Sequence, residues 1–331
     1  MTRAFFEGTG FHVPKRIVTN DDLAALMDTS DEWIRSRTGI EQRHWVTEGE
    51  TGVSLARAAA LRALESAGIG PADIDAIVYA TSTPDHFCPG MAVLLQDALG
   101  AGSIPAIDIR TQCSGFVYSL SVANAWIRTG DHRRVLVVGQ EIQSTAMDVS
   151  TAGRDTAVIF ADGAGAVVLT ADESGQRGIL AFDLKSDGSR MDQLWVESPS
   201  SKNHPRITLE DLAAGRHLLR MNGKEVFRRA VEAMPESAAA VLTKAGLTID
   251  DVDLVIPHQA NLRISDMVQR RLGLSDDRIY NNIQRYGNTT AATIPIALDE
   301  CVRAGRIERD DIVLLTAFGS GFLWGSTVIR W

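Results

Sequence analysis

Hydrophobic and polar positions alternate along this chain with two different periods. Apolar side chains spaced three or four residues apart predict amphipathic helices at residues 53–67, 116–127, 225–244 and 289–303. Short, mainly apolar runs predict strands at residues 106–109, 157–160 and 166–169, and such runs imply sheets that are covered on both faces. Because strands and helices alternate, the pattern predicts α/β layers.

One part of this pattern occurs twice. Residues 62–80 and 240–258 both predict a helix, a glycine stop, a short loop and a buried strand. A constant spacing relates the two segments and pairs Gly68 with Gly246. Two similar units of this size indicate an internal duplication.

The repeat continues beyond these segments. Charged turns beginning at Gly130 and Gly305 each run into an apolar strand. Two similar halves with buried sheets would pack helices between and outside the sheets, which predicts a duplicated five-layer αβαβα sandwich. A polar turn near residues 170–180 places the boundary between an N-terminal half, residues 1–175, and a C-terminal half, residues 176–331.

Composition narrows the functional classes. The chain has 331 residues, of which 45% are apolar, yet no run approaches the roughly 20 apolar residues that span a bilayer. The first residues do not resemble a signal peptide, so we expect a cytoplasmic protein that does not associate with membranes. A formal net charge of -9 argues against nucleic acid as a partner.

The three cysteines point to chemistry at one thiol. Their number and spacing match neither a disulfide framework nor a metal site. Cys113 lies where a short strand ends and a helix begins, and a helix N-terminus favours the nucleophilic thiolate. Cys301 lies within an amphipathic helix and fits a core position, whereas Cys88 lies in a loop.

His258 and Asn288 are the candidate partners of this thiol. His258 follows a buried strand, and Asn288 precedes a helix that it could simply cap. The duplication brings both residues and Cys113 to corresponding strand-to-helix ends on one face. A cysteine, a histidine and an asparagine suit a thiolate nucleophile with a base and a neutral hydrogen-bond donor.

Six segments, in this order, carry a specific resemblance: DEWIRSRTGI, QCSGF, FADGAGAVVL, PHQANLRI, RYGNTTAATIP and FGSGFLWGS. The chain resembles the β-ketoacyl-acyl carrier protein synthase III family over nearly its whole length. The resemblance implies a thiolase-like fold, a homodimer and a decarboxylative condensation. In that reaction Cys113 takes an acyl group from acyl-CoA, and His258 with Asn288 stabilises the enolate formed when malonyl-acyl carrier protein loses carbon dioxide. It implies no metal or redox cofactor, because the coenzyme A thioester is itself the substrate.

The resemblance also assigns residues to binding and to oxyanion stabilisation. The backbone amides of Cys113 and Ser320 would hold the oxyanion, although the family usually has glycine or alanine at the position of Ser320. Gln112 and Ser114 flank the cysteine where small apolar residues are common.

The expected CoA-binding residues are Trp33, Arg37, Arg154, Gly223, Phe227 and Asn261. The expected carrier-protein-binding residues are Arg228, Arg263, Arg270 and Arg271, for which a solvated helix face is an equally good explanation. Phe87 and Cys88 would lie on a loop that crosses a dimer interface into the partner's acyl pocket.

Other activities fit less well. Relatives that use a glutamate base, the hydroxymethylglutaryl-CoA synthase and olefin-forming enzymes, would place it near residues 81–91, which contain Asp85 but no glutamate. A non-catalytic subunit would lack the cysteine, and a simple hydrolase explains neither the duplication nor Asn288. An acyltransferase that moves an acyl group to an alcohol or amine remains the main alternative.

Overall fold

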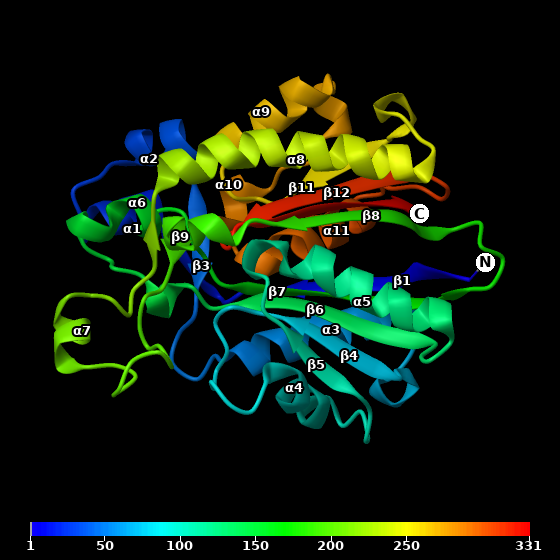
Figure 1. The fold of residues 1–331 in the computed structure, drawn as a ribbon, viewed down its shortest axis with the longest axis horizontal. Helices are drawn as coiled ribbons and strands as arrows, with labels where there is room; N and C mark the ends of the chain where they lie inside the picture. Colours follow the sequence, from blue (N-terminus) through cyan, green and yellow to red (C-terminus); the bar gives the residue numbers. More distant parts are fainter. Residues whose placement is uncertain (1) are drawn as a thin grey trace.

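The computed structural model describes residues 2–331 and consists of five layers (Figure 1). Two sheets are stacked, with one helical layer between them and another outside each sheet. This arrangement confirms the predicted duplicated αβαβα sandwich. No helix among residues 2–331 is long and apolar enough to cross a membrane.

The first sheet has five strands. Their order is β1 (Arg3–His12), β7 (Gly163–Asp172), β6 (Arg134–Glu141), β4 (Ala76–Ala80) and β5 (Ala106–Ile109). The pairs β1–β7 and β7–β6 are antiparallel, and β6–β4 and β4–β5 are parallel. Strand β4 is buried along its whole length, as the apolar pattern predicts for a strand covered on both faces.

The second sheet has the same plan with four strands. Their order is β8 (Gly178–Ser186), β13 (Leu323–Arg330), β12 (Ile312–Gly319) and β11 (Leu254–Pro257). The chain passes from the first sheet to the second between β7 and β8, within the turn that carries the predicted boundary at residues 175 and 176. The division into an N-terminal half, residues 1–175, and a C-terminal half, residues 176–331, stays a prediction.

Helices fill three layers around these sheets. Between the sheets lie α5 (Gly115–Thr129) and α11 (Thr293–Arg303). The first sheet is covered by α3 (Gly52–Ala67) and α4 (Met91–Leu99), and the second by α8 (Gly223–Ala245) and α9 (Leu262–Leu272). Residues 2–331 also form eight 3-10 turns: η1 (Pro71–Asp73), η2 (Gln112–Ser114), η3 (Ser144–Ala146), η4 (Thr151–Gly153), η5 (Gly188–Gln193), η6 (Ile249–Asp251), η7 (Asp276–Arg278) and η8 (Thr290–Ala292).

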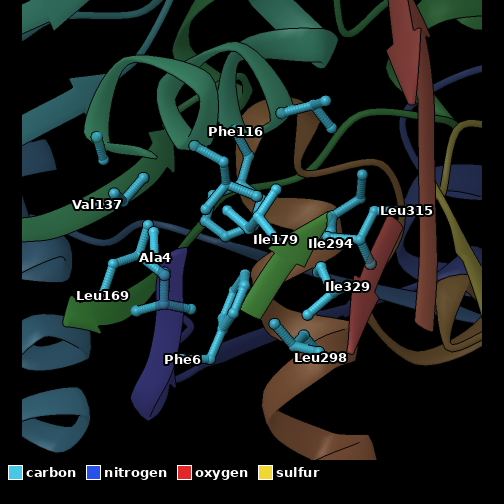
Figure 2. Packing of buried hydrophobic residues seen from close by; sticks show 14 of the residues in the cluster. Ala4, Phe6, Phe116, Val137, Leu169, Ile179, Ile294, Leu298, Leu315 and Ile329 are labelled. Carbon is cyan, nitrogen blue, oxygen red and sulfur yellow. The ribbon is translucent and has the colours of Figure 1, made fainter. Parts of the chain in front are cut away.

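The middle layer is the largest apolar core. Figure 2 shows Phe116 of α5 and Ile294 and Leu298 of α11 packed among side chains from both sheets, such as Val137 and Leu315. These side chains are at most 1% exposed. Since burial of one large apolar side chain contributes about 1.5–3 kcal/mol, this shared core fixes the relative position of the two halves.

A smaller lobe flanks the sandwich. It contains a two-stranded ribbon, a second short ribbon and five short helices: β2 (Arg16–Thr19), β3 (Gln42–Trp45), β9 (Leu194–Trp195), β10 (Arg220–Met221), α1 (Asn20–Ala24), α2 (Asp31–Thr38), α6 (Arg154–Ala157), α7 (Leu209–Ala213) and α10 (Ile283–Tyr286). Most of these elements share an apolar cluster that includes Trp45 and Phe160.

The strand predicted at residues 157–160 is wrong. The segment begins as the end of α6 and makes only one isolated bridge, between Phe160 and Asn288. The carbonyl of Val158 accepts a hydrogen bond from the buried guanidinium of Arg43 instead of a neighbouring strand. The apolar run reflects burial beneath the Asn288 loop and not membership of a sheet.

The duplication is visible in individual hydrogen bonds. In the first half, the carboxylate of Asp75 accepts from the backbone amides of Arg133 and Arg134 at 2.8 Å, which fixes the start of β6. In the second half, Asp253 accepts from the amide of Ile312 at 2.7 Å and fixes the start of β12. The predicted repeat is therefore confirmed down to equivalent side chains with the same task.

We predict that Asp75→Ala and Asp253→Ala each lower the free energy of unfolding, by about 1–2 kcal/mol, because each leaves strand-initiating amides without a charged acceptor. Denaturant unfolding followed by circular dichroism measures this change. Asp250→Ala, which removes an exposed neighbour of the same charge in η6, should change stability by less than about 0.5 kcal/mol. An equal effect of all three substitutions would contradict the proposed task of the paired aspartates.

Candidate active site

Cys113 lies at the junction between β5 and α5. It is the central residue of the turn η2, two residues before α5 begins, and is 5% exposed. The backbone amides of Cys113 itself and of Ser320 favour the thiolate form and lower the pKa of the thiol, against the effect of burial. These are the two amides expected to hold an oxyanion, and that role stays a prediction.

The turn η2 packs very closely against the other half of the molecule. A Cβ atom on Gly319, at the end of β12, would lie 2.8 Å from the Cβ of Cys113. A Cβ atom on Gly115 would lie 3.3 Å from the Cβ of Ala291 in η8. Glycine is therefore required at position 319 for β12 to approach the nucleophile.

His258 enters the site from the second sheet. It follows β11 directly, and its backbone amide donates to the carbonyl of Thr316 in β12 at 2.8 Å. Its ring Nδ1 lies 2.7 Å from the hydroxyl oxygen of Thr293, the first residue of α11. The other ring nitrogen, Nε2, is buried and has no hydrogen-bond partner within residues 2–331.

Asn288 is held by its backbone and by its side-chain oxygen. Its amide donates to the carbonyl of Ile159, and its carbonyl accepts from the amide of Ala161. The side-chain Oδ1 accepts from the amide of Thr290 at 2.9 Å. Because Oδ1 is occupied, the Nδ2 amide group is left as a donor, which is the group that an oxyanion requires.

The turns η2 and η8 occupy equivalent places in the two halves and share a rare backbone conformation. Gln112 has φ 45° and Thr290 has φ 50°, in the left-handed region that is strained for any residue other than glycine. The spacing that pairs Gly68 with Gly246 also pairs these two residues. Strain of this kind gathers at functional sites, and here it marks the turn that contains Cys113 and the turn that follows Asn288.

Cys113 opens onto a cavity of about 1250 Å³. Its apolar wall near the thiol includes Ile142, Phe160, Leu194 and Leu219. Thr290 and Ser320 also line it, and the hydroxyl of Ser320 donates to the carbonyl of Leu194. A hollow of this size beside the sulfur can hold an acyl chain.

Burial keeps both the thiol and the imidazole uncharged. It raises the pKa of Cys113 to about 12, and the carboxylate of Glu141 adds to the increase. Burial also lowers the pKa of His258 to about 3. The expectation that the helix N-terminus favours a resting thiolate is therefore wrong for the free protein, because desolvation outweighs the helix dipole and the two amides.

Glu141 is a buried carboxylate that sequence reasoning missed. It is completely buried at the end of β6 and accepts hydrogen bonds from Ser82, Thr83 and Gln143. Burial raises its pKa to about 7, while these donors lower it. Residues 81–91 contain no glutamate, but Ser82 and Thr83 of this segment donate hydrogen bonds to the carboxylate of Glu141.

Four of the six predicted CoA-binding residues form one group at the surface. The guanidinium carbons of Arg37 and Arg154 lie 5.0 and 4.6 Å from the ring centroid of Trp33. The side chain of Asn261 donates to the carbonyl of Arg37 at 3.1 Å. An indole flanked by two cations suits a stacked nucleotide base with nearby phosphates.

The other two predicted CoA-binding residues lie beside this group, at α8. Gly223 is the first residue of α8, and Phe227 follows one turn later, with the guanidinium of Arg263 5.8 Å from its ring centroid. None of the six residues lines the cavity at Cys113. Their part in binding stays a prediction.

The four predicted carrier-binding arginines differ in their pairing. Arg228 forms an ion pair with Glu225 at 2.8 Å, so its charge is largely compensated. Arg263, Arg270 and Arg271 of α9 are exposed and form no ion pair in the described chain. The uncompensated positive charge is therefore concentrated on α9.

Phe87 and Cys88 lie on the loop between β4 and α4. Phe87 is 67% exposed, lines the outer part of the cavity and has the guanidinium of Arg206 4.1 Å from its ring centroid. Cys88 is exposed and does not line the cavity. Cys301 is buried in the middle layer, as expected for a core residue.

Thr290 and Thr293 are the other residues that sequence reasoning missed. Both follow Asn288 within the segment GNTTAAT, and each hydrogen-bonds to one of the candidate catalytic residues. The signal that could have identified them is their position in η8 and at the start of α11, which is equivalent to the start of α5 beside Cys113. No group of three potential metal-ligating side chains occurs in residues 2–331.

Comparisons with known proteins agree with this geometry. The family models described as 3-oxoacyl-[acyl-carrier-protein] synthase III and as its C-terminal part match residues 107–188 and 242–331. The chain is 46% identical over 331 residues to the β-ketoacyl-[acyl-carrier-protein] synthase III of Rhizorhabdus wittichii, with full coverage of both chains. It is 47% identical to the enzyme of the same name from Cereibacter sphaeroides, with 99% coverage of each.

The chain is also similar to solved structures of proteins with related names. The 3-oxoacyl-[acyl-carrier-protein] synthase III of Aquifex aeolicus superposes with a TM-score of 0.91 at 41% identity, covering 99% of this chain and 100% of that one. The priming β-ketosynthase of the R1128 polyketide pathway superposes with a TM-score of 0.92 at 35% identity, covering 100% and 96%. The chain therefore belongs to the β-ketoacyl-[acyl-carrier-protein] synthase III family.

Proposed function

We propose that this protein condenses an acyl-CoA starter with malonyl-acyl carrier protein, with loss of carbon dioxide, to give a 3-oxoacyl product. One observation carries the proposal: the buried thiol of Cys113 lines a large cavity, and the backbone amides of Cys113 and Ser320 favour its thiolate form. Acyl transfer to an alcohol or amine is not favoured, because the relatives cited above are named as synthases.

In the first half-reaction the Cys113 sulfur attacks the acyl-CoA carbonyl. Because the resting thiol and imidazole are both neutral, the thiol proton passes to His258 only as the sulfur–carbon bond forms. The amides of Cys113 and Ser320 stabilise the tetrahedral oxyanion. Coenzyme A leaves with the proton, and the acyl group stays on the sulfur in the cavity.

In the second half-reaction the malonyl thioester loses carbon dioxide. The electron pair of the broken carbon–carbon bond moves onto the thioester oxygen, which then needs fixed donors. Asn288 offers Nδ2 because its Oδ1 is engaged, and His258 offers Nε2. The resulting carbanion attacks the acyl-cysteine and releases the 3-oxoacyl product and the free thiolate, which regains a proton.

Several finer features belong to the same proposal. The indole of Trp33 between Arg37 and Arg154 would hold the nucleotide of coenzyme A, and the exposed arginines of α9 would attract the acidic carrier protein. The enzyme would be a cytoplasmic homodimer, with Phe87 entering the partner's acyl pocket. The reaction as proposed needs no metal or redox cofactor.

We predict that Cys113→Ala abolishes covalent acylation by acyl-CoA, whereas Cys88→Ala and Cys301→Ala retain it. Of the three cysteines, only Cys113 lines the cavity and has two backbone amides that favour its thiolate form. Intact-mass measurement followed by peptide mapping reports the site of the adduct. An acyl adduct on another residue of the wild-type protein would refute the assignment of the nucleophile.

We predict that Asn288→Ala still forms acyl-Cys113 but loses malonyl decarboxylation by roughly two to three orders of magnitude, the effect typical of removing one oxyanion donor. His258→Ala should lose at least as much and should also slow acylation, because it removes the acceptor of the thiol proton. Labelled carbon dioxide release from malonyl-acyl carrier protein measures decarboxylation. If Asn288→Ala decarboxylated at the wild-type rate, the second half-reaction would need a different donor.

We predict that Arg263→Glu or Arg270→Glu raises the apparent KM for the carrier-bound substrate severalfold, on the order of 3- to 10-fold, and leaves acylation by acyl-CoA nearly unchanged. The reason is loss of electrostatic steering, so the effect should shrink at high salt. Arg128→Glu, an equal charge reversal at an exposed arginine in the last turn of α5 that forms no ion pair in the described chain, is the matched control. Equal losses with both substrates would instead indicate damage to the fold or to CoA binding.

A further inference from the structure

We propose that Thr293 is a positioning residue that determines which ring nitrogen of His258 carries the proton, and that its hydroxyl serves both half-reactions. This inference rests on the condensation proposed above and deepens it. Sequence reasoning assigned no role to Thr293, which begins α11 directly behind the imidazole.

The hydroxyl of Thr293 lies between the imidazole and the turn η8. Its oxygen is 2.7 Å from Nδ1 of His258 and 3.0 Å from the carbonyl oxygen of Thr290, and the residue is 2% exposed. The amide of the same Thr290 orients Asn288. One short segment therefore positions both of the proposed donors.

A neutral imidazole has only one N–H, so its partner decides where that proton lies. Burial keeps His258 neutral near pH 7, because it lowers the pKa of the ring to about 3. No other side chain within residues 2–331 hydrogen-bonds to the ring, and Nε2 has no partner there. The hydroxyl of Thr293, which can both donate and accept a hydrogen bond, therefore decides which ring nitrogen carries the proton.

In the free enzyme the Thr293 hydroxyl donates to the carbonyl of Thr290, which can only accept. The hydroxyl oxygen must then accept from Nδ1–H, and Nε2 carries a lone pair. That lone pair takes the proton of Cys113 while the sulfur–acyl bond forms and the acyl–CoA bond breaks, and it then gives the proton to the departing CoA sulfur. His258 leaves the first half-reaction in the form in which it entered.

The second half-reaction needs the opposite form, with a proton on Nε2 facing the thioester oxygen. The Thr293 hydroxyl supports it by turning away from Thr290 and donating to Nδ1, while the ring exchanges its proton with solvent between the two half-reactions. A hydroxyl satisfies Nδ1 in both forms. A side chain that only donates or only accepts would favour one half-reaction over the other.

The test uses protein labelled with ¹⁵N in the histidine rings, whose chemical shifts distinguish N–H from lone-pair nitrogen. His258 is assigned by comparison with His258→Ala, and the variants are Thr293→Val, Thr293→Ser and the control Thr289→Val. Thr289 is also fully buried beside Asn288, and its hydroxyl has no hydrogen-bond partner in the described chain. We expect Nδ1–H in wild type, Thr293→Ser and Thr289→Val, and a shifted or mixed tautomer in Thr293→Val.

Kinetics should follow the same pattern. Thr293→Val should lower both acylation and decarboxylation by roughly 10- to 100-fold, while Thr293→Ser restores both and Thr289→Val changes neither. An Nε2–H tautomer in the free wild-type protein, or unchanged ring shifts in Thr293→Val, would overturn the inference. The wild-type spectrum alone shows the tautomer of the free protein, so the inference can still be tested if a variant fails to fold. A wild-type enzyme that releases no carbon dioxide would refute the condensation itself, independently of the ring spectra.

Discussion

The close approach of two equivalent turns, η2 and η8, is the constraint on which the rest of the site depends. Each turn joins one half of the sandwich to a helix of the shared middle layer. The packing leaves no room for a side chain at Gly319, which meets Cys113 of η2, or at Gly115, which lies between Ala80 and Ala291 of η8. Each turn also holds one non-glycine residue in the left-handed region, Gln112 or Thr290. The apolar middle layer supplies the free energy that offsets this strain, because α5 and α11 are its central helices.

This packing also buries the site, so that charged forms of its side chains are energetically unfavourable. Cys113, His258 and Glu141 are all buried, and burial shifts each pKa toward the neutral form. A resting thiolate–imidazolium pair is therefore unfavourable, and negative charge develops only where amides already point. This is the arrangement expected of an enzyme that stabilises successive oxyanions with preorganised donors.

Much of the fold could be predicted from the sequence because the duplication leaves a regular trace. The equivalent aspartates, glycine stops and buried strands are local features with fixed spacing, and they locate Cys113 and His258 at corresponding edges. Residues 157–160 were misassigned because an apolar run reports burial and does not report hydrogen-bond partners; here Arg43 and the Asn288 loop supply those partners.

Glu141, Thr290 and Thr293 were missed for a related reason. Their importance comes from contacts across the chain that no local pattern contains, and the pairing of Arg228 with Glu225 likewise shows only in three dimensions.

The central claim is that a single buried thiol receives an acyl group and that the neighbouring donors then drive a decarboxylative condensation. It is tested most directly by intact-mass measurement of the wild-type protein exposed to a panel of acyl-CoAs and then to malonyl-acyl carrier protein, with carbon dioxide followed in parallel. The account predicts a mass increase of one acyl group on Cys113, its loss when the second substrate is added, and one carbon dioxide released for each 3-oxoacyl product. An acyl-enzyme that is stable to malonyl-acyl carrier protein, releases no carbon dioxide and is discharged by an alcohol or amine would contradict it.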